Sequence, residues 1–479
     1  MHRSSGVLLH VSSLPGKYGC GDFGRGATEF IDKAAACGFS LWQVLPFCVP
    51  DRYASPYSSM STFSGNPYFI DLEELHRRGL LTADELAAAE QKSPYACEFE
   101  RLGAERLPLL FRAAARAAQD PDTVAAVDAF IATNPRVAEF CLFMAKRTAN
   151  GGSAWQEWTT DGFDDRVLFA WRFIQYEFFT EWANVKAYAN SNGISVIGDI
   201  PFYVALDSSD VWGSRSQFLL DRDGRPEWVA GVPPDYFSAD GQLWGNPLYD
   251  WKHMKADGWS FWRDRLTFML SMFDGIRIDH FRAVESYFAI PGDADTAREG
   301  KWRRGPGLEF AKMIKDIAGD KLIIAEDLGY PSPEVVQLLS DSGLPGMKVL
   351  EFAFDSRDPS DYLPHSCNFN SICYTGTHDN APLALWRTEA DKADIAFAVQ
   401  YLGLNDREGF NRGIIRGGMS SVAKLFVAQM QDWLDLGAGH RMNIPGTSRG
   451  NWEWRMLPGE ASKKLAGQIR EMTRIYGRS

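Results

Sequence analysis

The feature of this sequence that most limits its fold is a series of eight short apolar segments separated by helical stretches. Most of these segments are apolar almost without interruption, which is typical of parallel strands buried on both faces. The segments cover residues 6–11, 41–46, 195–201, 275–279, 322–327, 347–352, 372–379 and 441–445. Eight parallel strands alternating with helices close a (β/α)8 barrel. We therefore predict a single α/β (TIM) barrel over residues 1–479.

Two intervals between these segments are longer than a connection in such a barrel requires. Residues 50–190, between the second and third segments, have a helical pattern, with a capping box at Thr82 and Glu85 and a helix start at Asn134. We predict that they form an inserted, mainly helical subdomain. Residues 212–251 are rich in Trp, Gly, Pro and Asp. There we predict a second insertion made of loops throughout.

Composition excludes several classes of protein. The net charge of −12 argues against a nucleic-acid partner, which needs clustered Lys and Arg. The seven Cys residues show no C-x-x-C spacing, so we expect no disulfide framework and no zinc site. No run of 18 apolar residues and no signal peptide is evident. We expect a cytoplasmic protein without a membrane span, metal or cofactor.

Three of the predicted strands end in carboxylates. Asp279 ends the fourth, Glu326 lies at the tip of the fifth, and Asp379 ends the seventh. In a parallel barrel the carboxyl ends of all strands converge on one mouth, where reactive groups lie. A single carboxylate in such a place is often only the N-cap of the next helix. Three of them together favour a catalytic site.

The spacing of two of these strands suggests a reaction. The fourth and fifth strands are neighbours and lie ~4.8 Å apart, so we expect the carboxyl groups of Asp279 and Glu326 about 5 Å apart. That separation suits double displacement at a glycosidic bond, whereas inverting enzymes need about 6.5–9.5 Å. Arg277 would stabilise an ionised Asp279 nucleophile, and Glu326 needs a raised pKa to act as acid/base. Asp379, across the mouth with His378, is better placed to hold sugar hydroxyls.

The same stretches carry a family resemblance. RIDHFR (277–282), IIAEDLG (323–329) and TGTHDN (375–380) resemble signature regions of the α-amylase clan, in the form found in 4-α-glucanotransferases (amylomaltases or disproportionating enzymes). SPYSS, FSGNPY, GDIPFYV, GVPPDYFS and GQLWGNPLY are also similar to segments of that family. The resemblance covers residues 6 to about 455.

What this resemblance implies is specific. The enzyme would be a retaining 4-α-glucanotransferase acting on α-1,4-glucans, with glucose or another glucan as acceptor and with no C-terminal β-sandwich. Asp279 would be the nucleophile, Glu326 the acid/base and Asp379 the transition-state stabiliser. Substrate contacts are implied for Ser55, Tyr57, Asp199, Asp235, Tyr236, Phe237, Gln242, Trp244, Arg277, Asp327, Phe352, His378 and Asn443, with Tyr236 and Phe237 on the acceptor side.

Other interpretations remain open. A hydrolase of the same clan would use the same three carboxylates with water as acceptor, and a non-catalytic glycan-binding protein would be expected to have lost one of them. The stretch 19–24 (GCGDFG) matches a dinucleotide-binding pattern, but no acidic residue follows at the end of the next strand. The pattern favours a tight turn there.

Overall fold

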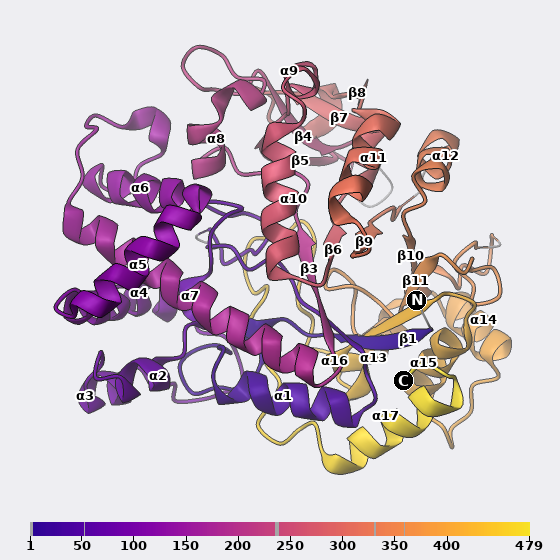
Figure 1. Cartoon of the computed structure of the whole chain (residues 1–479). Helices are drawn as coiled ribbons and strands as arrows, with labels where there is room; N and C mark the ends of the chain where they lie inside the picture. Colours follow the sequence, from indigo (N-terminus) through magenta and orange to yellow (C-terminus); the bar gives the residue numbers. More distant parts are fainter. Residues whose placement is uncertain (1–2, 52, 235–238, 330–331, 359) are drawn as a thin grey trace.

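The computed structural model describes residues 3–51, 53–234, 239–329, 332–358 and 360–479, and its centre is an eight-stranded parallel barrel (Figure 1). The strands follow the order β10-β11-β12-β1-β2-β3-β6-β9. Their bounds are β1 Ser4–Leu8, β2 Leu41–Gln43, β3 Ser195–Ile200, β6 Gly275–Ile278, β9 Leu322–Ala325, β10 Gly346–Val349, β11 Ser371–Tyr374 and β12 Leu425–Gln429. The Ala325 amide donates to the Pro345 carbonyl at 2.9 Å, which joins β9 to the start of β10 and closes the barrel.

The predicted barrel is confirmed, and seven of the eight predicted segments overlap one of its strands. The prediction for 441–445 is wrong: the eighth strand is β12, about fifteen residues earlier. Every residue of β12 is buried, as a strand between β11 and β1 requires. The stretch 441–445 contains a charged Arg441 and a Pro445 that has no amide to donate, and it forms a connection at the barrel mouth.

Helices occupy most of the long interval between β2 and β3. They are α2 Leu72–Arg77, α3 Ala83–Ala88, α4 Phe99–Ala117, α5 Pro121–Thr133, α6 Pro135–Ala149 and α7 Asp165–Ser191. Helix α1 Arg25–Ala36 lies earlier, between β1 and β2. The capping box at Thr82 and Glu85 is confirmed at the start of α3. Figure 1 shows α4, α5 and α6 gathered beside the barrel, with α7 running from them back to it. Trp182 of α7 donates to the Met272 carbonyl at the end of α10 at 3.0 Å, and its ring packs 6.5 Å from that of Trp42 in β2, so this helix also covers the barrel wall.

The remaining helices follow β3. They are α8 Ser209–Gly213, α9 Trp251–Ala256, α10 Ser260–Met272, α11 Gly307–Ala318, α12 Pro333–Ser342, α13 Leu383–Glu389, α14 Lys392–Leu402, α15 Phe410–Ser420, α16 Met430–Trp433 and α17 Lys463–Ile475. The stretch 19–24 is an irregular bent segment before α1, and its Gly21 amide donates to the Ser12 carbonyl at 2.9 Å. A Cβ at Gly21 would lie 2.0 Å from the Val11 carbonyl oxygen, so the close packing of this segment requires glycine.

A second, antiparallel sheet corrects the prediction of loops throughout 212–251. Its strands are β4 Trp228–Val232, β5 Gln242–Pro247, β7 Ser286–Pro291 and β8 Lys301–Arg304, in the order β5-β4-β7-β8. Only β4 and β5 lie within the predicted insertion. β4 pairs with β5 on one side and with β7 on the other, and β7 pairs with β8. Because β7 and β8 follow the barrel strand β6, the sheet joins distant parts of the chain. In Figure 1 the sheet lies near the top, beyond β3 and β6.

Candidate active site

The centre of the site is the end of β6, where Arg277 and Asp279 lie on the same face. Arg277 Nη2 donates to Asp279 Oδ1 at 2.7 Å, and the Asp279 amide donates to the Ile200 carbonyl of β3 at 2.9 Å. The Arg277 side chain is almost fully buried, and its pKa is raised well above the usual value: burial lowers it, but Asp199 and Asp279 raise it by more. The predicted pairing of Arg277 with Asp279 is confirmed, and it places a buried positive charge against this carboxylate.

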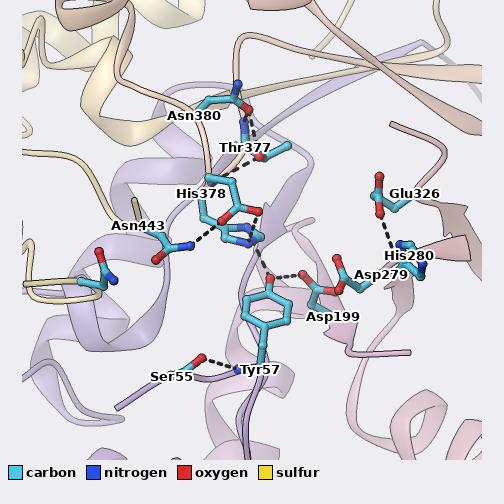
Figure 2. A network of polar contacts seen from close by, with 12 residues as sticks. Ser55, Tyr57, Asp199, Asp279, His280, Glu326, Thr377, His378, Asn380 and Asn443 are labelled. Carbon is cyan, nitrogen blue, oxygen red and sulfur yellow. Dashed lines mark hydrogen bonds and ion pairs between the residues drawn. The ribbon is translucent and has the colours of Figure 1, made fainter. Parts of the chain in front are cut away.

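A hydrogen-bonded chain continues from Arg277 across the mouth, and Figure 2 shows its members Asp199, Tyr57 and His378. Arg277 Nη1 donates to Asp199 Oδ2 at 2.6 Å, and the Tyr57 hydroxyl donates to the same oxygen at 2.7 Å. The Tyr57 hydroxyl also lies 3.3 Å from His378 Nδ1, and the two rings stack with centroids 4.8 Å apart. Tyr57, Asp199, Arg277 and His378, all predicted to contact sugar, thus form one preorganised network.

Asp379 is held at the far end of this network. Asn443 Nδ2 donates to Asp379 Oδ1 at 2.7 Å, and His378 Nε2 lies 3.4 Å from Asp379 Oδ2. Arg441 Nη2 donates to the Asp379 carbonyl at 2.7 Å. Although 441–445 is not the eighth strand, it brings Asn443 against Asp379 at the mouth.

Glu326 lies on the opposite side of Asp279 from His378 (Figure 2). Its Oε2 accepts from the His280 amide at 2.7 Å, and its Oε1 accepts from the Leu328 amide at 2.8 Å. Burial, and after it the neighbouring Asp279 charge, raise the pKa of Glu326 to about 7 against the opposing effects of Arg277 and the two amides. The raised pKa that an acid/base requires is therefore present.

Strand register places the two carboxylates opposite each other. Along β6 and β9, Arg277 pairs with Ile324 and Ile278 pairs with Ala325. Asp279 and Glu326 are the next residue on each strand, and the Glu326 amide donates to the Ile278 carbonyl at 3.0 Å. This register supports the expected separation of about 5 Å for neighbouring strands.

The other predicted substrate residues fall into three groups. Ser55 accepts from the Tyr57 amide at 3.3 Å, and Trp244 donates to Gln242 at 3.1 Å while its ring lies 4.9 Å from that of His280, so these residues border the network. Phe352 and Asp327 do not join it: Phe352 is exposed after β10, and the buried Asp327 accepts from the Met347 amide at 2.7 Å and so ties β9 to β10. Asp235, Tyr236 and Phe237 lie outside the described residues.

Sequence reasoning assigned no role to three residues of the site. His280 has a φ of +50°, and this left-handed turn aims its amide at Glu326. Trp452 packs against Tyr57 and His378, with ring centroids 5.8 and 5.7 Å away. Glu351 accepts from Asn380, which in turn accepts from the Thr377 amide and hydroxyl behind Asp379. No local pattern marks these residues, because each acts through a contact with a distant segment.

Neither a metal-binding cluster nor a membrane-spanning helix is found in the described part of the chain. No group of three His, Cys, Asp or Glu side chains among these residues is arranged to hold a metal ion. None of the helices described here has both the length and the apolar character needed to cross a membrane.

Comparison with known proteins gives consistent matches. The sequence profile of the family described as 4-alpha-glucanotransferase matches residues 9–460. The chain is 40% identical to a 4-alpha-glucanotransferase from Clostridium butyricum, covering 98% of this chain and 100% of that protein. It is 38% identical to a chloroplastic/amyloplastic 4-alpha-glucanotransferase from Solanum tuberosum, covering 99% and 86%.

The structure has equally close neighbours. An amylomaltase from Streptococcus agalactiae, solved in complex with acarbose, matches with a TM-score of 0.95 at 36% identity, covering 100% of both chains. An amylomaltase from Corynebacterium glutamicum matches with a TM-score of 0.80 at 19% identity, covering 99% of this chain and 75% of that one. The latter likeness concerns the fold alone.

Proposed function

Because this chain belongs to the 4-alpha-glucanotransferase family and is a glucanotransferase, we propose that it uses Asp279 as nucleophile and Glu326 as acid/base in a retaining transfer between α-1,4-glucans. The observation that carries this assignment is the contrast between two neighbouring carboxylates. Asp279 is paired with the buried Arg277, whereas the Glu326 carboxyl has a pKa raised to about 7. One is thus suited to attack and the other to protonate.

In the first step, an Asp279 oxygen bonds to the anomeric carbon of the donor sugar as the glycosidic C–O bond breaks. Glu326 gives its proton to the departing oxygen, so the shortened glucan leaves as an alcohol and Glu326 becomes a carboxylate. Asp379 and His378 lie across the mouth from Asp279 and are placed to hold hydroxyls of a sugar distorted toward an oxocarbenium ion.

The second step follows from the electrostatics of the first. Once Asp279 is an ester, its negative charge no longer raises the pKa of Glu326. Glu326 can then remain ionised and accept the proton of an acceptor 4-hydroxyl as that oxygen attacks the anomeric carbon. The ester bond breaks, Asp279 is released as a carboxylate, and two inversions give net retention.

The acceptor is a glucan or glucose, and the enzyme acts in the cytoplasm. A hydrolase would run the same two steps with water as acceptor, so the carboxylates alone do not distinguish the two activities. Trp244, Gln242 and His280 border the site on the side of Glu326, where an acceptor must enter. A bound sugar there is positioned for attack, which favours it over more abundant water.

The test is the product pattern from maltotriose. We expect glucose together with maltodextrins longer than maltotriose, separated by chromatography, because transfer of a maltosyl unit releases glucose from the donor and lengthens the acceptor. The Asp279→Asn variant serves as the blank. Glucose and maltose without longer chains would instead establish the hydrolase.

A further inference from the structure

One exposed aromatic side chain lies outside the network described above. Trp302 is in β8, the edge strand of the antiparallel sheet, and 45% of its surface is exposed. The Arg282 guanidinium lies over its ring at 4.3 Å, and the Phe288 ring packs at 5.4 Å with its plane tilted by 68°. The indole is thus fixed by two neighbours while much of it remains open to solvent. A large aromatic held in this way is a ready surface for a ligand.

Trp302 is connected to the acid/base side of the catalytic site. Arg282, which covers its ring, lies in the short 3-10 turn Phe281–Val284 that begins two residues after Asp279. In the same turn the Phe281 amide donates to the Glu326 carbonyl at 2.9 Å. Two consecutive contacts therefore lead from the backbone of Glu326 to the exposed indole.

The sheet face that carries Trp302 has a second exposed apolar residue on its other edge strand. Gly231 of β4 pairs with Leu243 on one side and with Phe288 on the other, and Phe288 pairs with Trp302. Residues paired directly across antiparallel strands project from the same face. Leu243 is 43% exposed, whereas Phe288 between the two edges is 5% exposed and packs with Val229, Ile290 and Ala297, so this face is open at its edges and covered between them. Three strand spacings separate the two edges, roughly 14 Å.

We propose that Trp302, at the open edge of this sheet, is a platform that binds an outer sugar residue of a long acceptor α-glucan. This inference rests on the proposed function, because it takes Glu326 as the group that activates the acceptor. The acceptor hydroxyl reaches the site from the side of Glu326, and the rest of a long acceptor must leave on that side. Trp302 and its supporting Arg282 lie there. The apolar face of an indole can stack on the C–H groups of a sugar ring, and this contact does not require a charged ligand.

The experiment compares acceptors of different length. Maltosyl fluoride is the fixed donor, glucose and maltohexaose are the acceptors, and the extended products are quantified. We expect Trp302→Ala to raise the KM for maltohexaose about three- to tenfold, with kcat and the KM for glucose unchanged. Trp302→Phe keeps an aromatic platform and should stay within about twofold of the wild type.

Trp228→Ala is the matched control. Trp228 belongs to the same sheet but lies on its opposite face, between Lys301 and Arg303, whose cations approach its ring to 4.5 and 4.0 Å. It should change neither KM. If Trp302→Ala alters both acceptors equally, or neither, the proposed platform is wrong. If the wild-type enzyme extends no acceptor at all, the transfer function itself is wrong, and this result is distinct from the other two.

Discussion

Two carboxylates of similar chemistry receive different surroundings at the scale of single residues. Asp279 accepts a hydrogen bond from the buried guanidinium of Arg277. Glu326 instead accepts hydrogen bonds from two backbone amides and lies beside the Asp279 carboxylate. Asp279→Asn should lower the turnover of every glucan donor by roughly 10⁴-fold or more. Glu326→Gln should lower turnover of natural glucans roughly 10²–10⁴-fold, yet spare fluoride release from a glycosyl fluoride, whose leaving group needs little protonation. Equal loss of fluoride release in both variants would contradict the two roles.

The pKa of Glu326 also sets a pH dependence. Its protonated form is required for the first step on a glucan, and burial and the Asp279 charge raise its pKa to about 7. The rate on maltodextrins should therefore fall as the pH rises through about 7. Fluoride release from a glycosyl fluoride should show no such fall, because it does not need the proton of Glu326. A rate on maltodextrins that stays constant from pH 6 to 9 would be inconsistent with this assignment.

The residues that sequence reasoning found share one property. Asp279 and Glu326 each follow an apolar strand directly, and Asp379 lies five residues after the end of β11, so local pattern places all three at the mouth. His280 and Trp452 were missed because their roles depend on a left-handed turn and on packing between distant segments. Their chemistry is set by tertiary contacts, which no single-sequence pattern encodes.

At the scale of elements, the barrel strands were readable because burial on both faces makes them continuously apolar. The prediction at 441–445 was wrong because that segment is less continuously apolar than β12, every residue of which is buried. The small sheet was missed because β4 pairs not only with β5 but also with β7, which lies beyond β6 in the chain. Pairing between distant strands leaves no local pattern.

Close packing of neighbouring strands gives a test with one substitution at two sites. A Cβ at Gly6 in β1 would lie 2.6 Å from both the Cβ and the carbonyl oxygen of Leu41 in β2, so Gly6→Ala should destabilise by about 1–3 kcal/mol. Gly467 lies exposed inside α17 with nothing within 4 Å of its added Cβ, so Gly467→Ala should stabilise by about 0.5–1 kcal/mol. Urea unfolding measures both, and changes of the same sign would refute the packing argument.

At the scale of the whole molecule, the site needs the barrel to be closed at both ends. The mouth joins Tyr57, Asp199, Arg277, His378 and Asn443, which come from distant parts of the chain. These contacts hold only if the strands beneath them keep their register. The opposite end of the barrel is therefore part of the support of the catalytic geometry.

Arg478 closes that opposite end. Its fully buried guanidinium donates to carbonyls at the starts of β1 and β12 and at the end of α15: Ser4 at 3.2 Å, Ala423 at 2.8 Å, Ser421 at 3.0 Å and Met419 at 2.6 Å. Arg478→Ala leaves these buried acceptors without a donor and opens a void, so it should destabilise the protein by about 3 kcal/mol or more.

Two further variants separate the hydrogen bonds of Arg478 from its charge. Arg478→Lys keeps the charge but not the planar set of donors, and it should recover less than half of the lost stability. Arg474→Ala removes an exposed arginine of α17 and should change the free energy of unfolding by no more than about 0.5 kcal/mol. Because the strands at the mouth and at this end are the same, Arg478→Ala should also lower the temperature at which activity is lost in step with the melting temperature. A variant that melts earlier but keeps its activity to the original temperature would show that the mouth does not depend on this closure.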